Sequence, residues 1–398
     1  MEWKEVLLGE LVDIYDSKRI PLTSQEREKI KGDIPYYGAQ GIIDYINQFL
    51  FDGEYILIAE DGNNIISRQE NIAQIAKGKF WVNNHAHILQ GKIEQNLLCY
   101  IINHTDISGY VTGSAQPKLN QANLLKIPIK IPVNLSDQRK IAGILYALDA
   151  KIENNNKINA NLEAQAEALF KSWFVDFTPF KDQPFVDSEL GPIPQGLKIC
   201  QISDISHTLE TGRRQKGGAV SEGIPSVGAE HVKGIGTYDY SKTKYISPEF
   251  ANKLKTGKIN GYELLIYKDG GKPGYFIPNF SIFGEGYPFD LCYLNEHVFK
   301  LDFLQNKGYN IFNYFQFKTN YVMSFLNAQG GKAAIPGINK KDIECIYTFA
   351  PNNPKVVEFG NFALPLFTKI LRNCVENQRL VALRDTLLPK LMSGEIKL

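Results

Sequence analysis

Apolar residues recur at alternating intervals of four and three along two long stretches of the chain. The first such seam is Ile141, Leu145, Leu148, Ile152, Asn155, Asn159, Leu162, Ala166, Leu169 and Trp173. The second is Ala363, Leu366, Ile370, Asn373, Asn377, Leu380, Arg384, Leu387 and Leu391. This spacing is the a/d pattern of a coiled coil, so it predicts two long helices.

Each seam contains two asparagines at matching places, Asn155 and Asn159 in the first and Asn373 and Asn377 in the second. A buried asparagine lowers the stability of a coiled coil but selects its register. We therefore expect the two helices to pack against each other, antiparallel, with the asparagine pairs face to face. The alternative is that each helix packs only on its own domain. Pro365 predicts that the second helix begins or kinks at that residue.

The rest of the chain contains an internal repeat of short apolar runs and turns. Four blocks recur in the same order, namely 32–40 with 222–230, 53–62 with 261–270, 82–89 with 294–301, and 116–127 with 335–346. In both copies an apolar run ends in an Asp-Gly turn signal, at Asp61 and at Asp269. Four collinear matches indicate a duplicated domain.

The repeat and the seams together define the expected architecture, an α+β fold with two pseudo-repeat domains joined by two long antiparallel coiled-coil helices. The expected order is domain 1–133, helix 134–178, linker 179–196, domain 197–352 and helix 353–398. The linker is assigned because it contains four prolines and two glycines in 18 residues.

Composition excludes several classes of protein. No apolar run in the 398 residues approaches the ~18 residues of a membrane span. The five cysteines are widely spaced, which argues against a disulfide framework and for a reducing, cytoplasmic location. The 44 basic and 43 acidic residues give a net charge of +1, which by itself argues against a nucleic-acid partner.

Sequence signatures of catalysis are missing. The chain has no P-loop, no HExxH, no GxSxG and no Asn/Asp-Pro-Pro-aromatic signature of amino-methyltransferases. His85 and His87 form an HxH pair, but the second copy has His297 and Phe299 there and no cysteine aligns, so we expect no metal site. A binding protein is therefore favoured over an enzyme. The alternatives are a motif-poor carbohydrate-active enzyme using Asp61 and Asp269, and a scaffold that binds proteins only.

Two similar domains on a paired-helix spacer suit a ligand with two related features a fixed distance apart, such as a bipartite DNA site. Basic residues in Gly-rich loops are candidate phosphate contacts, and Arg, Asn and Gln side chains in loops are candidate base readers. An ordinary solvated surface is the competing explanation for each of them. The candidates in the first copy are Lys18, Arg19, Tyr36, Gln40, Asn63, Arg68, His85, Gln116 and Lys118. Those in the second copy are Arg213, Arg214, Lys216, Glu230, His231, Lys233, Lys268, Lys272, His297 and Lys332.

The chain resembles the specificity subunits of type I restriction–modification systems. The resemblance is carried by IPYYGAQGIIDYI (34–46), GEYILIAEDG (53–62), KFWVNNHAHIL (79–89), TGSAQPKLN (112–120), and the helix sequences at 137–174 and 376–396. It implies two target recognition domains, each reading half of an interrupted DNA site, and helices that set the spacing and dock two methylation subunits. It further implies restriction/motor subunits recruited through the methyltransferase, S-adenosylmethionine bound in the methylation subunit, and no catalysis or cofactor in this chain.

Overall fold

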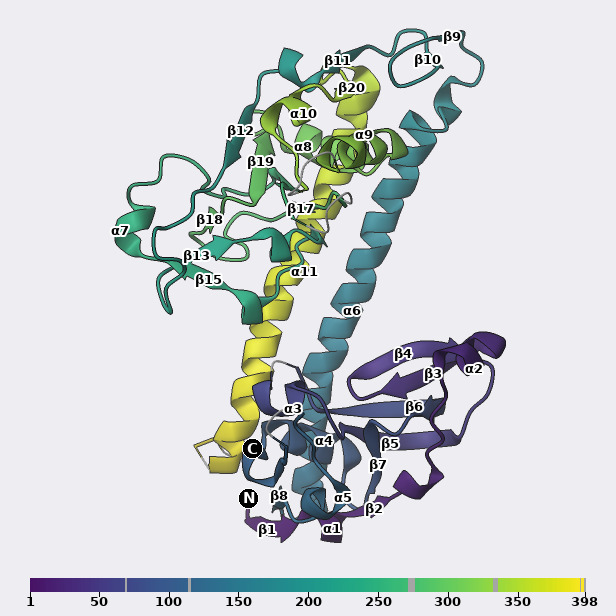
Figure 1. The fold of residues 1–398 in the computed structure, drawn as a ribbon, viewed down its shortest axis with the longest axis vertical. Coiled ribbons are helices and arrows are strands. Elements are labelled where there is room, and N and C mark those ends of the chain that lie inside the picture. Colours follow the sequence, from purple (N-terminus) through teal and green to yellow (C-terminus); the bar gives the residue numbers. More distant parts are fainter. Residues whose placement is uncertain (69, 114–115, 271–275, 332–335, 394, 397–398) are drawn as a thin grey trace. The chain divides into compact units, whose positions relative to one another are not determined.

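The computed structural model describes residues 1–398 except 69, 114–115, 271–275, 332–335, 394 and 397–398 (Figure 1). The chain forms two compact units. The first unit is Met1–Ile152 with Leu380–Leu398, and the second unit is Glu153–Arg379. The two long helices, α6 (Leu135–Phe174) and α11 (Pro354–Ser393), each contribute residues to both units. No helix in the described part of the chain is both long and apolar enough to cross a membrane.

The first unit is built on a six-stranded sheet in which all described pairings are antiparallel except that of β3 with β6. In spatial order its strands are β2 (Val12–Ile14), β7 (Ala86–Gly91), β5 (Phe51–Ala59), β6 (Ala73–Val82), β3 (Lys31–Gly38) and β4 (Gly41–Ile46). A second, two-stranded sheet pairs β1 (Trp3–Leu7) with β8 (Pro128–Pro132). The short helices are α1 (Leu8–Leu11), α2 (Ser24–Lys29), α3 (Asn64–Ser67), α4 (Gln95–His104) and α5 (Gln121–Leu124).

Strand β5 shows why this part of the sequence reads as a continuous apolar run. Ile56 and Ile58 pack in a core cluster with α4 residues such as Ile101, whereas Leu57 packs in a separate cluster with Phe80. Successive side chains of a strand point to opposite faces. Both faces of β5 are therefore covered, and alternation between apolar and polar residues is lost.

The second unit contains a five-stranded sheet with the order β12 (Thr208–Thr211), β19 (Val298–Asp302), β16 (Leu264–Tyr267), β17 (Phe280–Ile282) and β14 (Gly234–Ile235). Its smaller sheets are β15 (Lys244–Ile246) with β13 (Ile224–Val227) and β18 (Tyr293–Leu294), β11 (Ile199–Gln201) with β20 (Tyr347–Phe349), and β9 (Phe185–Val186) with β10 (Ile193–Pro194). The last pair lies in the expected linker. The helices are α7 (Pro248–Ala251), α8 (Lys307–Phe317), α9 (Asn320–Gly330) and α10 (Lys340–Glu344).

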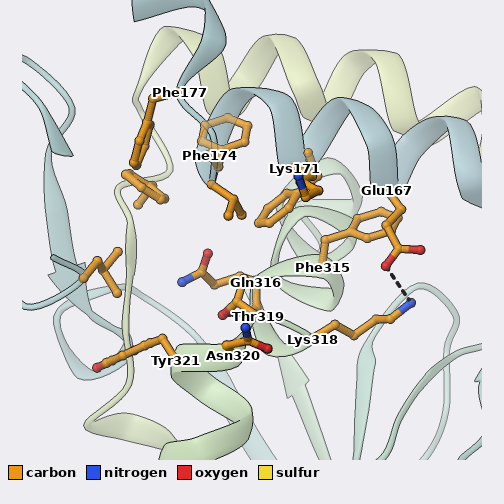
Figure 2. Close-up of a pocket in the computed structure, with 14 residues that line it drawn as sticks. Glu167, Lys171, Phe174, Phe177, Phe315, Gln316, Lys318, Thr319, Asn320 and Tyr321 are labelled. Atoms are coloured by element: carbon orange, nitrogen blue, oxygen red, sulfur yellow. Dashed lines mark hydrogen bonds and ion pairs between the residues drawn. The ribbon is translucent and has the colours of Figure 1, made fainter. Parts of the chain in front are cut away.

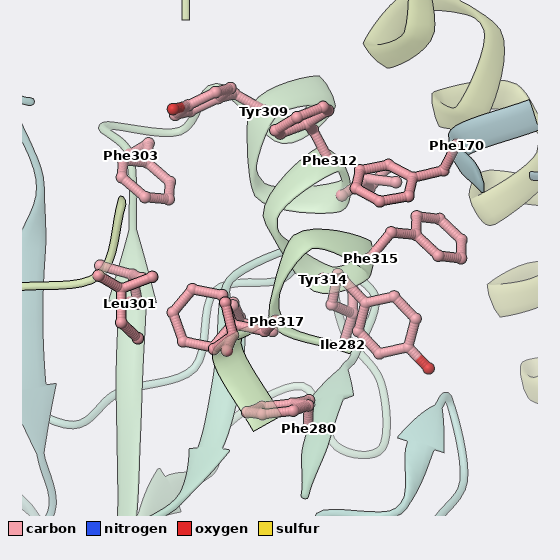
Figure 3. Close-up of a cluster of buried hydrophobic side chains, with 14 of the residues drawn as sticks. Phe170, Phe280, Ile282, Leu301, Phe303, Tyr309, Phe312, Tyr314, Phe315 and Phe317 are labelled. Atoms are coloured by element: carbon pink, nitrogen blue, oxygen red, sulfur yellow. The ribbon is translucent and has the colours of Figure 1, made fainter. Parts of the chain in front are cut away.

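Much of the aromatic content of the chain is buried around α8 (Figure 3). On one side Phe317 packs against Phe280 of β17, with ring centroids 5.4 Å apart. On the other side Phe315 stacks on Phe170 of α6 at 5.7 Å and meets Phe359 of α11 at 5.8 Å. Residues 309–317 of this helix are all buried, so the helix has almost no solvent-exposed face, which explains the aromatic run in its sequence.

The strand pairing confirms the duplication. Ile58 of β5 lies opposite His87 of β7, and Ile266 of β16 lies opposite Phe299 of β19. The fourth pair of aligned blocks also has the same local structure in both units. Asn120 caps α5 through its side chain, and Asn339 caps α10 in the same way. The aligned blocks therefore occupy equivalent places in the two units.

The two long helices are antiparallel within each unit, as the seams predicted. In the second unit Asn155 Nδ2 donates to Asn377 Oδ1 (2.9 Å) and Asn373 Nδ2 donates to Asn159 Oδ1 (2.7 Å). In the first unit Arg384 donates to Asp149 (2.6 Å). The seam residues Ile141 and Leu145 of α6 and Leu391 of α11 share one core cluster of that unit with Leu388 of α11.

Two details of the second helix differ from expectation. The helix begins at Pro354 and continues through Pro365. Proline suits the first helical position, where no N–H is needed, and Pro365 lies on an exposed position of the helix, so that the carbonyl left without a helical donor can be hydrated. Near the end of the seam Leu388 is fully buried while Leu387 is only partly buried.

Candidate nucleic-acid interface

Three loop segments meet beside the end of β5 in the first unit. Asp61 follows the strand and accepts a hydrogen bond from His85 Nδ1 (2.7 Å). The backbone N–H of His85 donates to Asn83 Oδ1 (2.8 Å), which holds the Asn-x-His turn. The third segment joins through a bridge between Asp61 and Lys118. The exposed side chains of His85 and Lys118 are thereby placed on neighbouring loops.

The second unit repeats this arrangement beside the end of β16. His297 Nδ1 donates to Asp269, and the N–H of His297 donates to Asn295 Oδ1 (2.9 Å). Asp269 forms a bridge with Gly337, at the place that Lys118 has in the first unit. We call these two groups of loops the first and the second loop cluster. They consist of residues 60–62, 83–85 and 117–119 in the first unit and of residues 268–270, 295–297 and 336–338 in the second.

Below the first loop cluster lies a buried cluster of charged side chains. Arg19 donates to Glu60 Oε2 (2.6 Å) and to the Ala86 carbonyl (2.9 Å). His87 contacts Asp16 Oδ2 through Nδ1 (2.6 Å) and the Leu119 carbonyl through Nε2 (2.7 Å). Arg19 therefore anchors the strand ends, and its guanidinium is already occupied by contacts within the protein.

The protonation of this cluster follows from its contacts. Burial raises the pKa of Asp16, but the hydrogen bond and charge of His87 and the positive charge of Arg19 outweigh burial, so the pKa lies below 3.8. Burial also opposes ionisation of Glu60, yet hydrogen bonds from Arg19 and Lys118 hold the pKa of Glu60 below its usual value. Both carboxylates are therefore charged at neutral pH.

Asp16, Glu60 and His87 bring three possible metal ligands within 4.8 Å of one another. The guanidinium of Arg19 already contacts both carboxylates, at 3.6 Å for Asp16 and 2.6 Å for Glu60. Both ring nitrogens of His87 are also in hydrogen bonds. A divalent cation would have to displace these contacts, so the residues fit an internally neutralised ion cluster better than a metal site.

Next to the second loop cluster is a polar cavity of about 300 Å³ whose lining includes Arg213, Arg214, Lys244 and His297. Arg214 lies 3.7 Å from Glu296, and its side chain is 78% exposed. Lys244 pairs with Glu230 at 3.1 Å. The structure thus brings several predicted contacts of the second copy into one concave, cation-rich surface. Such a surface attracts phosphates.

Other predicted contacts are placed at the surface without joining a common site. In addition to Arg213, His85 and Lys118, the exposed residues are Lys18, Gln40, Asn63, Gln116, Lys216 and Lys233. Their contact with DNA remains a prediction. Lys272 and Lys332 lie outside the described residues.

Four further predicted contacts are engaged within the protein, and two of them, Tyr36 and His231, are buried. Tyr36 is 1% exposed and its hydroxyl accepts from the Leu22 N–H. His231 is also 1% exposed and stacks on Tyr238 with ring centroids 4.0 Å apart. Arg68 donates to the carbonyls of Ile102 and Asn103 at the carboxyl end of α4, where a positive charge is favourable. Lys268 is half-buried and donates to the Glu296 carbonyl (3.0 Å).

An apolar pocket of about 330 Å³ lies at the end of α6 in the second unit (Figure 2). Aromatic rings such as Phe174, Phe177 and Phe315 line it, and Glu167 and Lys318 form an ion pair of 3.7 Å at its edge. Its described lining contains no histidine or cysteine that could act as a base or nucleophile. The pocket suits an apolar side chain.

Sequence reasoning missed the role of Asp61 and Asp269, which it assigned to turns or to an alternative enzyme. They belong to different units, and each is paired with a histidine. The signal was present in the repeat, because the Asp-Gly dipeptide and the Asn-x-His triplet recur together in both copies.

Comparison with known proteins agrees with this architecture. Residues 1–164 match the family model of the type I restriction modification DNA specificity domain. The MjaIX specificity subunit of Methanocaldococcus jannaschii is 28% identical over an alignment covering 100% of this chain and 96% of that protein. A putative type I restriction enzyme specificity subunit of Haemophilus influenzae is 32% identical, over 64% of this chain and 61% of that protein.

A solved structure shares the fold. The crystal structure of a type I restriction–modification S subunit from M. genitalium aligns with a TM-score of 0.59 and 16% identity, covering 98% of this chain and 96% of the other. Fold, repeat, helix pair and sequence similarity agree with one another. Residues 1–164 match the type I restriction modification DNA specificity domain, and the chain as a whole is similar to type I restriction enzyme specificity subunits.

Proposed function

We propose that this chain is the DNA sequence-recognition subunit of a type I restriction–modification complex, and that each unit reads one half of a bipartite, interrupted site. The observation that carries the proposal is the recurrence of one loop cluster beside equivalent strand ends in both units. Two related readers match two related half-sites. The similarity to specificity subunits supports the same function.

The charges beside the second loop cluster support a DNA ligand more than the net charge does. Arg213, Arg214 and Lys244 surround one cavity there, so positive charge is concentrated at this place although the chain as a whole is nearly neutral. Phosphate contacts supply most of the sequence-independent affinity of DNA-binding proteins. With a net charge of +1, this chain is expected to share that task with partner subunits.

The remaining partners follow from the resemblance and belong to the proposal. Two methylation subunits would dock on the paired helices and bind S-adenosylmethionine. Restriction/motor subunits would join through the methyltransferase. This chain would then act in the cytoplasm and contribute sequence choice without catalysis. Neither the carbohydrate-active enzyme nor the scaffold without DNA specificity is supported by these similarities.

The test is to co-express the chain with the methylation subunit encoded beside it and to map methylated bases in the host DNA. We expect one bipartite motif with a constant gap, absent when this chain is omitted. Exchanging residues 197–352 for those of a relative should change one half of the motif and leave the other half intact. Methylation without a motif, or a motif unaffected by the exchange, would contradict the proposal.

A further inference from the structure

His85 and His297 are equivalent residues that both face solvent. Their side chains are 49% and 46% exposed, and each ring is held through Nδ1 by the aspartate at the end of the neighbouring strand. Each sits in the same Asn-x-His turn, closed by Asn83 in one unit and Asn295 in the other. The imidazole is thus oriented from two sides while half of its surface remains free.

The backbone around the two histidines is also the same. The His85 carbonyl accepts from the Glu60 N–H (2.9 Å), and the His297 carbonyl accepts from the Lys268 N–H (3.0 Å). The aspartate and the histidine are therefore carried on adjacent strand ends in both units. Because both pairs lie at the ends of strands inside a sheet, their geometry is more rigid than that of an ordinary surface loop.

The residues that flank these pairs differ between the units. Before the aspartate is Glu60 in one unit and Lys268 in the other, and before the histidine is Asn84 or Glu296. Lys118 corresponds to Gly337. The two halves of an asymmetric site differ in their bases but share the sugar–phosphate backbone. Residues common to both readers therefore suit the shared part of the ligand, and residues that differ suit the bases.

The chemistry of the pair fits a phosphate. A carboxylate at Nδ1 accepts that N–H, so the second nitrogen, Nε2, is directed away from the aspartate. In the imidazolium form Nε2–H is a charged donor, and charge-assisted bonds to phosphate oxygens are short and strong. The other charged groups near His85 are Glu60 and Lys118, which pair at 3.1 Å.

Around His297 the neighbouring charged groups are Glu296, Lys268 and Arg214. Glu296 lies 3.4 Å from His297 Nε2 and 3.7 Å from Arg214, and Lys268 lies 3.7 Å from Asp269. Binding of a phosphate at Nε2 would leave Arg214 as the partner of Glu296. The positive charge of Arg214 would thus offset the negative charge of Glu296 next to the bound phosphate.

We propose that the Asp61–His85 and Asp269–His297 pairs are equivalent DNA-phosphate contacts, one in each unit, with the histidines as charged donors and the aspartates as positioning residues. The inference rests on the proposed function. It goes further by separating contacts that hold the DNA backbone from those that read bases.

The test uses the assembled methyltransferase and DNA duplexes carrying the mapped motif or a motif with one altered base pair. His85→Gln and His297→Gln should each weaken binding about tenfold on both duplexes, the loss expected for one charged hydrogen bond. Each should lower the slope of log affinity against log salt by about 0.9, the value for one phosphate contact. His104→Gln is the matched control, since His104 is an exposed histidine of the first unit outside the loop cluster, and it should change neither quantity.

A pH series tests whether the histidines act as charged donors, and variants of Asp61 and Asp269 test whether these aspartates position the histidine rings. Wild-type binding should weaken as the pH rises and imidazolium side chains lose their protons. Asp61→Asn and Asp269→Asn should weaken binding on both duplexes, because each histidine ring loses the carboxylate that orients it. The wild-type series needs no variant, so it tests the idea even if a substitution impairs folding.

Three results would overturn the inference, namely a variant that changes the preferred bases, variants with unchanged affinity and salt slope, or wild-type binding that does not weaken as the pH rises. A wild-type complex that shows no motif-specific binding would instead overturn the proposed function. The two failures are therefore distinguishable.

Discussion

At the scale of residues, Asp16, Arg19, Glu60 and His87 form a cluster of charged side chains that lies in the interior, although these residue types are usually found at the surface. Its side chains are at most 16% exposed, and each charge faces an opposite charge or a backbone carbonyl. Removing one member leaves the others buried without compensation, which is strongly destabilising. The cluster holds the strand ends from which the first loop cluster projects.

Asp16→Asn should lower the free energy of unfolding of the first unit by about 3 kcal/mol at pH 7, because Arg19 and His87 lose a charged partner. The folded pKa of Asp16 lies below the unfolded value of 3.8. Its contribution is therefore complete well above pH 3.8, begins to fall near that pH and is lost as the pH drops through the folded pKa. The difference between wild type and variant should shrink accordingly on acidification.

Urea unfolding followed by the fluorescence of Trp81, with Trp3 and Trp173 replaced by Phe, reports on the first unit. Trp81 is buried there and donates to the Ile20 carbonyl (2.6 Å). Asp13→Asn is the control, since its ion pair with Lys92 is exposed and should change stability by less than about 1 kcal/mol. Equal stability of Asp16→Asn and wild type at pH 7 would refute this account.

Replacing Arg213 and Arg214 with Ala should weaken DNA binding by the assembled complex on all sequences and lower its salt slope by about 1.8, or 0.9 for each phosphate contact. Both side chains line the cavity beside the second loop cluster. Arg372→Ala, an exposed arginine on α11 of the same unit, is the control. Unchanged affinity and site choice would remove both arginines from the interface.

At the scale of elements, the asparagines of the long helices form a ladder inside the second unit. Asn155 is fully buried and donates to both Asn377 and Glu376 at 2.9 Å. Its own Oδ1 has no partner among the described groups. An incompletely satisfied polar ladder is costly in a seam, and its best-attested benefit is the choice of register.

A double-mutant cycle measures this ladder. Asn155→Ala and Asn377→Ala should each destabilise the second unit by about 1–2 kcal/mol, with a coupling of about 1 kcal/mol, because each leaves the other amide unpaired. Urea unfolding followed by Trp173 fluorescence is the measurement. Asn154→Ala, on the exposed face of α6, should change stability by less than about 0.5 kcal/mol. Strictly additive effects would show that the two amides do not depend on each other.

At the scale of the whole molecule, a net charge of +1 conceals a local concentration of positive charge. Basic side chains collect around the cavity beside the second loop cluster. Each of the two long helices contributes residues to both units, so a change in helix length alters a part that both units share.

Deleting one heptad from each helix, residues 146–152 and 380–386, removes about 10 Å at 1.5 Å per residue. Because 3.4 Å of DNA corresponds to one base pair, we expect the gap of the methylated motif to shorten by about three base pairs, with both half-sites unchanged. Mapping of methylated bases in the host genome checks this. A variant of full length, with only the exposed residues of these heptads replaced by Ala, should keep the original gap. An unaltered gap after the deletion would refute the role of the helices as a spacer.

Local sequence patterns predicted the parts of this fold that depend on residues close together in the sequence. A seam with 4-3 spacing indicates which face of a helix is buried, and a repeated Asp-Gly after an apolar run indicates where a strand ends. The helices, their antiparallel pairing within each unit, the facing asparagines and the duplication could therefore be read from residues such as Asn155 and Asp61.

The burial of loop residues was decided by tertiary structure, because it depends on segments distant in sequence. Tyr36 and His231 have the residue types of a binding surface but lie in the interior, and Arg19 meets Glu60 41 positions away. Pro365 remains inside a helix because that position faces solvent. By itself the sequence determined the two repeats, the two seams and the resemblance to type I specificity subunits. Only the folded chain decided which polar side chains remain free to contact DNA, since that depends on how the loops of each copy close over the ends of its strands.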